Sequence, residues 1–193
     1  PPPETATPAS AARRFPFLLR IFEPAPSLSV LADDPAVIQT QYGRWRKRVL
    51  IASIVGYATF YMVRKNLGIA MPMMSRSVAE GGLGITKTDF GLFLTMHGLL
   101  YGVSKFANGF FADRCNARTF LVAGLLMSAV LNVLFGSSAG FAALGVFWML
   151  NGWFQGMGFP PCARLMTHWF SPKELATKMS IWNASTNIGA GLA

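Results

Sequence analysis

The chain has 193 residues, of which 52% are hydrophobic and 13% are charged. A soluble domain carries about a quarter charged residues, so this composition indicates an integral membrane protein in a lipid bilayer. The formal net charge is +9, but the cations lie in a terminal tail, at helix ends and within apolar segments. Because they form no single basic face, nucleic acid is not expected as a partner.

Residues 1–45 are rich in proline, alanine and serine, have no sustained period, and are predicted to form a disordered cytoplasmic tail. Within them, residues 13–22 are interpreted as a membrane-surface segment, a targeting remnant or a solvated stretch. A basic collar follows, and its members are Arg44, Arg46, Lys47 and Arg48. Under the positive-inside rule the collar places the amino terminus in the cytoplasm, so the first helix runs outward. The expected membrane is the plasma membrane.

The first membrane span is expected over residues 53–74, with Arg64 and Lys65 near its middle. Its large apolar residues supply about −4 kcal/mol toward insertion, whereas each central cation costs roughly 2.5 to 3.5 kcal/mol. The sum is near or above zero, so the cations must face other helices or a water-filled cavity. At about 100° per residue, Lys65 points about a quarter-turn away from a face that carries Tyr57, Tyr61, Arg64 and Gly68.

Arg64 is therefore the stronger candidate for a ligand. The alternative is a shorter span that stops at Val63. Arg64 would then lie near the end of the span and extend its side chain to the lipid headgroups. Residues 67–74 continue apolar, which favours the longer span.

Residues 75–88 are glycine-rich and are predicted to form an outer loop, and Asp89 suits the first turn of the next helix. The second span, expected over 90–112, carries His97, Tyr101 and Lys105 four residues apart on one face. Lys105 lies about 10 Å before the cytoplasmic end, so it points into the bundle or reaches toward the headgroups. His97 is interpreted as a packing histidine rather than a ligand.

Residues 109–118 are predicted to form a tight cytoplasmic turn, and the third span, 119–138, is expected to be structural. In the fourth span, 141–161, glycines allow close packing and Pro160-Pro161 should kink or unwind the helix. The start of a fifth helix places on one side the polar or aromatic residues Trp182, Asn183, Thr186 and Asn187. Residues 46–193 thus read as an incomplete amino-terminal half-bundle, and the chain as a fragment of a longer protein.

The charges within the spans are Arg64, Lys65 and Lys105, whereas the four acids between Glu80 and Glu174 lie at helix ends or in loops. Cations without intramembrane carboxylates favour an anionic substrate, and a guanidinium beside tyrosines suits a phosphate group. The pattern favours an anion transporter over a cation pump or an enzyme, with no cofactor. Cys115 and Cys162 lack zinc-site spacing, so no metal is expected. A structural fragment without a ligand would need Arg64 to face lipid headgroups.

Several linked motifs resemble the organophosphate:phosphate antiporters of the major facilitator superfamily. They are residues 56–66, residues 101–106, the Asp113-Arg114 turn, and residues 152–162. The resemblance implies an all-α integral membrane bundle of twelve helices, of which this chain covers helices 1–4 and the start of helix 5. It also implies alternating access and exchange of a sugar or glycerol phosphate for inorganic phosphate.

By the same resemblance, Arg64 corresponds to the phosphate-binding arginine and Lys105 to the family's helix 2 lysine. Pocket positions are implied for Tyr57, Tyr61, Gln155 and Trp182. The turn resembles the superfamily's Gly-x-x-x-Asp-Arg motif, with a gating and topology role, and its residues are Gly109, Asp113, Arg114 and Arg118.

Thr186 stands where the bacterial glycerol-phosphate carriers have a substrate-site histidine, and Phe159 stands where they have tryptophan. Residues 104–118 and 162–164 are similar to the family's hexose-phosphate sensor, which binds sugar phosphate and regulates a kinase. A receptor with a partner kinase is therefore the alternative to a carrier.

Overall fold

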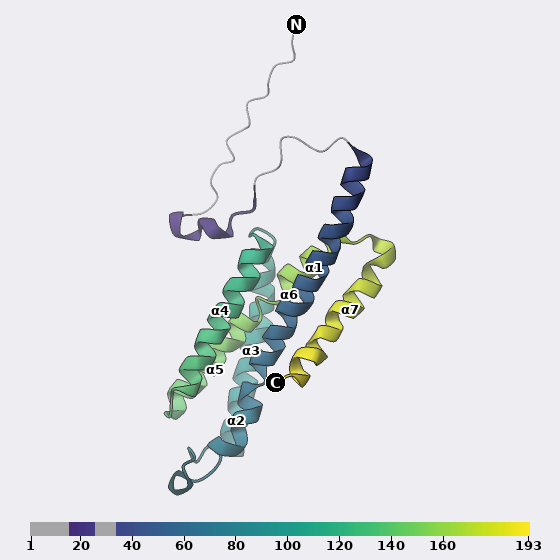
Figure 1. Cartoon of the computed structure of the whole chain (residues 1–193). Helices are drawn as coiled ribbons and strands as arrows, with labels where there is room; N and C mark the ends of the chain where they lie inside the picture. Colours follow the sequence, from purple (N-terminus) through teal and green to yellow (C-terminus); the bar gives the residue numbers. More distant parts are fainter. Residues whose placement is uncertain (1–15, 26–33) are drawn as a thin grey trace.

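The computed structural model describes residues 16–25 and 34–193, and these ranges contain helices and no strand (Figure 1). The elements are η1 (Phe17–Phe22), α1 (Pro35–Arg64), α2 (Asn66–Met74), η2 (Val78–Glu80), α3 (Lys87–Ala112), α4 (Ala117–Gly136), α5 (Phe141–Gln155), α6 (Phe159–Trp169) and α7 (Pro172–Gly191). The predicted all-α bundle is confirmed, with helix at each expected span.

The start of α1 lies at the same end of the bundle as the α3–α4 and α6–α7 turns (Figure 1). The loop 75–86 and the α4–α5 turn lie at the opposite end. The first end carries the collar together with Arg114, Arg118 and Lys173. It is called the basic end below.

The first helix begins earlier than the sequence pattern predicted. Asp34 caps α1 by accepting a hydrogen bond from the Ala36 backbone N–H at 2.8 Å, and Pro35 occupies the first turn, where its missing N–H costs nothing. The collar is therefore part of a helix that is continuous to Arg64, so residues 35–45 are not a disordered tail. Residues 17–22 also have 3₁₀ structure, while residues 1–15 and 26–33 lie outside the described residues.

Two of the expected spans are interrupted. The first divides at Lys65, whose backbone N–H donates to Met62 O at 3.3 Å, so Arg64 is the last residue of α1. The fourth divides at residues 156–158, between α5 and α6. The predicted disruption thus lies just before Pro160-Pro161 and not at the prolines themselves. Both prolines fit the first turn of α6, where no intrahelical N–H bond is needed.

Two of the glycines illustrate how closely the helices pack. A Cβ on Gly189 of α7 would lie 2.0 Å from the Ala58 carbonyl oxygen of α1. A Cβ on Gly156 would lie 1.8 Å from Ser104 Oγ of α3. The first contact lets α7 pack on α1 at backbone distance, and the second lets the Ser104 side chain of α3 lie against the end of α5.

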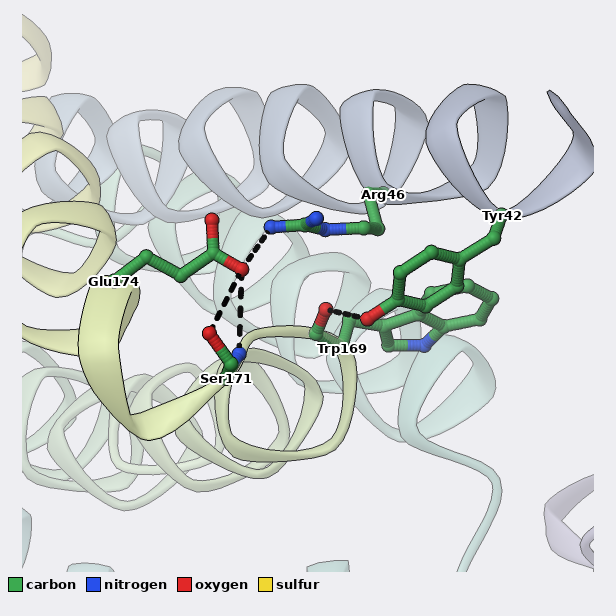
Figure 2. Close-up of polar contacts among 5 residues, drawn as sticks. All are labelled: Tyr42, Arg46, Trp169, Ser171 and Glu174. Atoms are coloured by element: carbon green, nitrogen blue, oxygen red, sulfur yellow. Dashed lines mark hydrogen bonds and ion pairs between the residues drawn. The ribbon is translucent and has the colours of Figure 1, made fainter. Parts of the chain in front are cut away.

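At the basic end, polar contacts join α1 to the α6–α7 turn (Figure 2). Tyr42 donates its hydroxyl hydrogen bond to Trp169 O at 3.0 Å, and Arg46 forms an ion pair with Glu174. Glu174 also accepts from the N–H and hydroxyl of Ser171, which completes the capping box of α7. One carboxylate therefore starts α7 and attaches it to α1.

The surface of the bundle is apolar. Phe106 is 85% exposed, Val133 68% and Leu126 61%, which is typical of helices that face lipid or further protein. By length and composition α4 can cross a membrane, and within the described residues it alone meets both criteria. Other spans carry cations, as α1 and α3 do, or are shortened by a break, as α5 is.

Candidate substrate site

The side chain of Arg64 reaches from α1 to residues of α3 and α5. Its Cζ is 4.7 Å from the ring centroid of Tyr61 and 4.1 Å from that of Tyr101. Its Nε donates a hydrogen bond to Gln155 Oε1 at 3.3 Å. These partners are aromatic rings and a neutral amide, so none of them neutralises the guanidinium.

Lys105 approaches the same aromatic ring from one turn further along α3. Its Nζ is 4.4 Å from the Tyr101 centroid and 5.2 Å from that of Phe159. In the part of the chain that the structure describes, the ion pair is Arg46–Glu174, at the basic end. Two half-buried cations thus share one ring and have no carboxylate partner among the described residues, an arrangement that favours an anion between or beside them.

Gln155 is held in place by a buried polar network that the sequence did not reveal. Its Nε2 donates to Ser128 Oγ at 2.8 Å, and that hydroxyl donates to Asn151 Oδ1. All three side chains are buried. The network leaves Gln155 Oε1 directed at Arg64. The sequence contains a signal for Asn151, because it lies four residues before Gln155 and so on the same helix face. It contains no such signal for Ser128.

The aromatic residues predicted for the pocket divide into two groups. Tyr61 contacts Arg64, as its position one turn before the cation suggests. Tyr57 instead packs against Trp182, with centroids 4.7 Å apart, and these two side chains are 4% and 1% exposed. Phe159 joins them at 5.5 Å from Trp182. Tyr57 and Trp182 therefore form a buried aromatic wall.

Arg64 and Lys105 each line a cavity. One of about 420 Å³ is lined by Arg64, Gly68 and Tyr101, so Gly68 stays beside Arg64 despite the break at Lys65. The other, of about 890 Å³, is lined by Lys105 and by Gly109 and Asp113 nearer the basic end. The two cations therefore line separate cavities that occupy different levels of the bundle.

His97 also lines the smaller cavity, but its contacts are those of a packing residue. Its Nδ1 is 3.0 Å from Trp148 O, its ring stacks on Trp148 with centroids 4.8 Å apart, and the side chain is buried. The packing interpretation of His97 is favoured.

The polar residues of α7 lie differently from the prediction. The buried face of α7 is formed by Trp182, Ser185 and Gly189, while Asn183 and Asn187 are exposed. Thr186 is half-buried, and its hydroxyl donates to Asn183 O at 2.8 Å. The four residues expected on one side are therefore split, because Gly189 selects the face that approaches α1.

The turn motif at the basic end is held by contacts with backbone oxygens. Arg114 donates to Phe110 O at 3.0 Å, and its Cζ lies 3.5 Å from the Phe110 ring centroid. Asp113 ends α3 and, like Arg118, is exposed. No role at the turn was predicted for Arg164 of α6. Its Nη1 donates hydrogen bonds to Ala112 O at 2.6 Å and to Cys115 O at 3.0 Å. Arg164 thereby joins the turn to the α6 half of the interrupted span.

Residues 42–193 match the family model described as Major Facilitator Superfamily. The chain belongs to the Major Facilitator Superfamily. Its helices are therefore those of an integral membrane protein.

Curated relatives agree with the motif resemblance. The chain is 44% identical over 179 residues to the glycerol-3-phosphate transporter of Bacillus subtilis, an alignment that covers 91% of this chain and 38% of the relative. It is 39% identical over 173 residues to a probable hexose phosphate transport protein of Chlamydia trachomatis, with 90% and 37% covered. It is 40% identical over 171 residues to the membrane sensor protein UhpC of Escherichia coli, with 89% and 38% covered.

The chain thus spans well under half the length of these relatives. No solved structure matches it. The predicted resemblance to the organic-phosphate branch of the superfamily is confirmed for this amino-terminal part.

Proposed function

We propose that the full-length protein is a secondary transporter that exchanges an organic phosphate for inorganic phosphate by alternating access. The observation that carries this proposal is the convergence of Arg64 and Lys105 on the Tyr101 ring, at 4.1 and 4.4 Å, while no carboxylate of the described residues pairs with either cation. Glycerol-3-phosphate and hexose phosphate are the substrates in the names of the similar proteins. The proposed localisation is the plasma membrane, with the basic end in the cytoplasm.

Arg64 would hold the phosphate through two parallel hydrogen bonds. Because its Nε already donates to Gln155, the edge formed by Nη1 and Nη2 is left for two phosphate oxygens. Lys105 would add a point charge from the level of the other cavity. Tyr61 and Tyr101 would position the guanidinium, and Tyr57, Trp182 and Thr186 would shape the far wall of the pocket.

The cavity beside Arg64 and the cavity beside Lys105 suit a substrate that passes from one end of the bundle to the other. The turn at Gly109, Asp113, Arg114 and Arg118 would then act as part of the gate at the basic end, with Arg164 linking it to α6. Since α6 follows directly after the break at 156–158, a rotation there would move the turn and the cavity wall together.

A sensor of external hexose phosphate that regulates a partner kinase is the second candidate, because the 40% identity to UhpC is close to the 39% identity to the probable hexose phosphate transport protein. Flux separates the two functions. The full-length protein in liposomes loaded with phosphate should take up labelled sugar phosphate or glycerol phosphate only while phosphate leaves. Saturable binding without counterflow would contradict the carrier and favour the sensor.

A further inference from the structure

A third cavity lies at the basic end, apart from the Arg64–Tyr101–Lys105 cluster. Its volume is about 580 Å³, and it is bounded by α1, α4 and α6 and by Pro24 and Ala25, which follow η1. In Figure 1, η1 lies beside the basic end of α4. The backbone N–H of Asn116 donates to Phe22 O at 2.7 Å, which fixes η1 on the α3–α4 turn.

The charged groups that line this cavity are all basic. They are Arg48, Arg118 and Arg164, with His168 beside them, and no aspartate or glutamate is among the described lining residues. Arg164 is already engaged with two backbone carbonyl groups, whereas Arg48 and Arg118 are exposed cations of α1 and α4. Glu23 precedes Pro24 in the chain but does not line the cavity. The cavity is therefore complementary to an anion at its rim.

The deeper wall of the cavity is apolar. On α1, Ala52 follows Arg48 by one turn, and on α4, Leu121 follows Arg118 by about one turn, so each helix presents a cation at the rim and a hydrocarbon surface below. Trp45 and Trp169 line the same cavity, and tryptophan is enriched at the level of lipid headgroups. A free phosphate ion would use the cations but leave this apolar wall uncovered.

We propose that this cavity binds one anionic phospholipid from the leaflet at the basic end. The headgroup phosphate lies between Arg48 and Arg118, and an acyl chain covers Ala52 and Leu121. Because α1, α4 and α6 all border the cavity, the lipid holds the interrupted fourth span against the first. The site is separate from the transported substrate, since neither Arg64 nor Lys105 lines it.

The full-length protein in detergent should retain phosphatidylglycerol in native mass spectrometry and be stabilised by it against heating more than by phosphatidylcholine. The double variant Arg48→Gln/Arg118→Gln should weaken phosphatidylglycerol binding at least about tenfold, because charge-assisted hydrogen bonds to the phosphate are lost. A matched control is Arg76→Gln/Lys87→Gln, which removes two exposed cations at the opposite end and should bind the lipid as the parent does.

A second variant tests the acyl contact without a change in charge. Ala52→Phe fills the apolar wall and should lower phosphatidylglycerol binding while the cations remain. Equal retention of the two lipids by the parent, or unchanged binding in both site variants, would overturn the proposal. Displacement of the lipid by millimolar glycerol phosphate as readily as by phosphatidylglycerol would identify a soluble-phosphate pocket instead, and would also overturn it.

Discussion

Arg64 Nε and Gln155 Oε1 lie 3.3 Å apart, although 91 residues separate them in the chain. Each residue ends its helix, since Arg64 is the last residue of α1 and Gln155 the last of α5. The first and fourth spans are therefore in contact at the points where each is interrupted. A guanidinium fixed in this way by a neutral amide keeps its charge for a ligand, which is the basis of the first prediction.

Arg64→Lys should lower the affinity of the full-length protein for organic phosphate by about ten- to hundredfold. Lysine keeps the charge but loses the two parallel hydrogen bonds, each to a charged group. The control is Arg76→Lys, the same exchange at an exposed loop position. Binding of a labelled phosphate ester and exchange flux would be measured in parallel, and parent-like values for Arg64→Lys would rule out phosphate chelation there.

Val78→Cys and Lys173→Cys should distinguish the two faces of the membrane. Both positions are exposed, at opposite ends of the bundle, whereas Cys115 and Cys162 are buried and should give little background. In intact cells an impermeant thiol reagent should label Val78→Cys and spare Lys173→Cys. The opposite pattern would place the basic end outside.

Gly189→Ala should destabilise the packing of α7 on α1 by about 1–3 kcal/mol, because the new methyl group would overlap the Ala58 carbonyl oxygen. Gly191→Ala is the matched control, since a Cβ there meets nothing within 4 Å. Thermal unfolding in detergent would compare the two variants. Equal midpoints would show that α7 does not approach α1 at this point.

Glu174 should make stability depend on pH below about pH 5. The hydrogen bond from Arg46 is the main cause that lowers the pKa of Glu174, with further donation from Ser171. A carboxyl with a lowered folded-state pKa stabilises the protein above its unfolded pKa, and this stabilisation disappears as pH falls through the folded value.

The Glu174→Gln variant preserves the helix cap and removes the charge, so it isolates the ion pair. Its unfolding midpoint should lie below that of the parent at pH 7, and the two should converge as the pH falls. Glu80→Gln, in the exposed loop, is the control and should follow the parent throughout. A gap between parent and Glu174→Gln that stays constant with pH would exclude the ion pair as its source.

The sequence by itself determined which stretches are helical and that Arg64 and Lys105 belong to them. Thr86 with Asp89 starts α3 in a capping box, as the acidic first turn at Asp89 indicated. The insertion cost of Arg64 indicated a site because that cost depends on local composition alone. The early start of α1 was not predicted from the sequence. The capping signal at Asp34-Pro35 lies in a stretch without hydrophobic periodicity.

Only the tertiary structure decided which residues meet. Gln155 and Ser128 form their contacts with Arg64 and Asn151 across helices, and Tyr57 turned to Trp182 rather than to the cation. In a membrane helix both lipid-facing and buried surfaces are apolar, so hydrophobic periodicity does not fix the rotation of a helix about its axis. That rotation was set by close contacts such as Gly189 on Ala58, which place Trp182 and Ser185 inward and leave Asn183 and Asn187 outward.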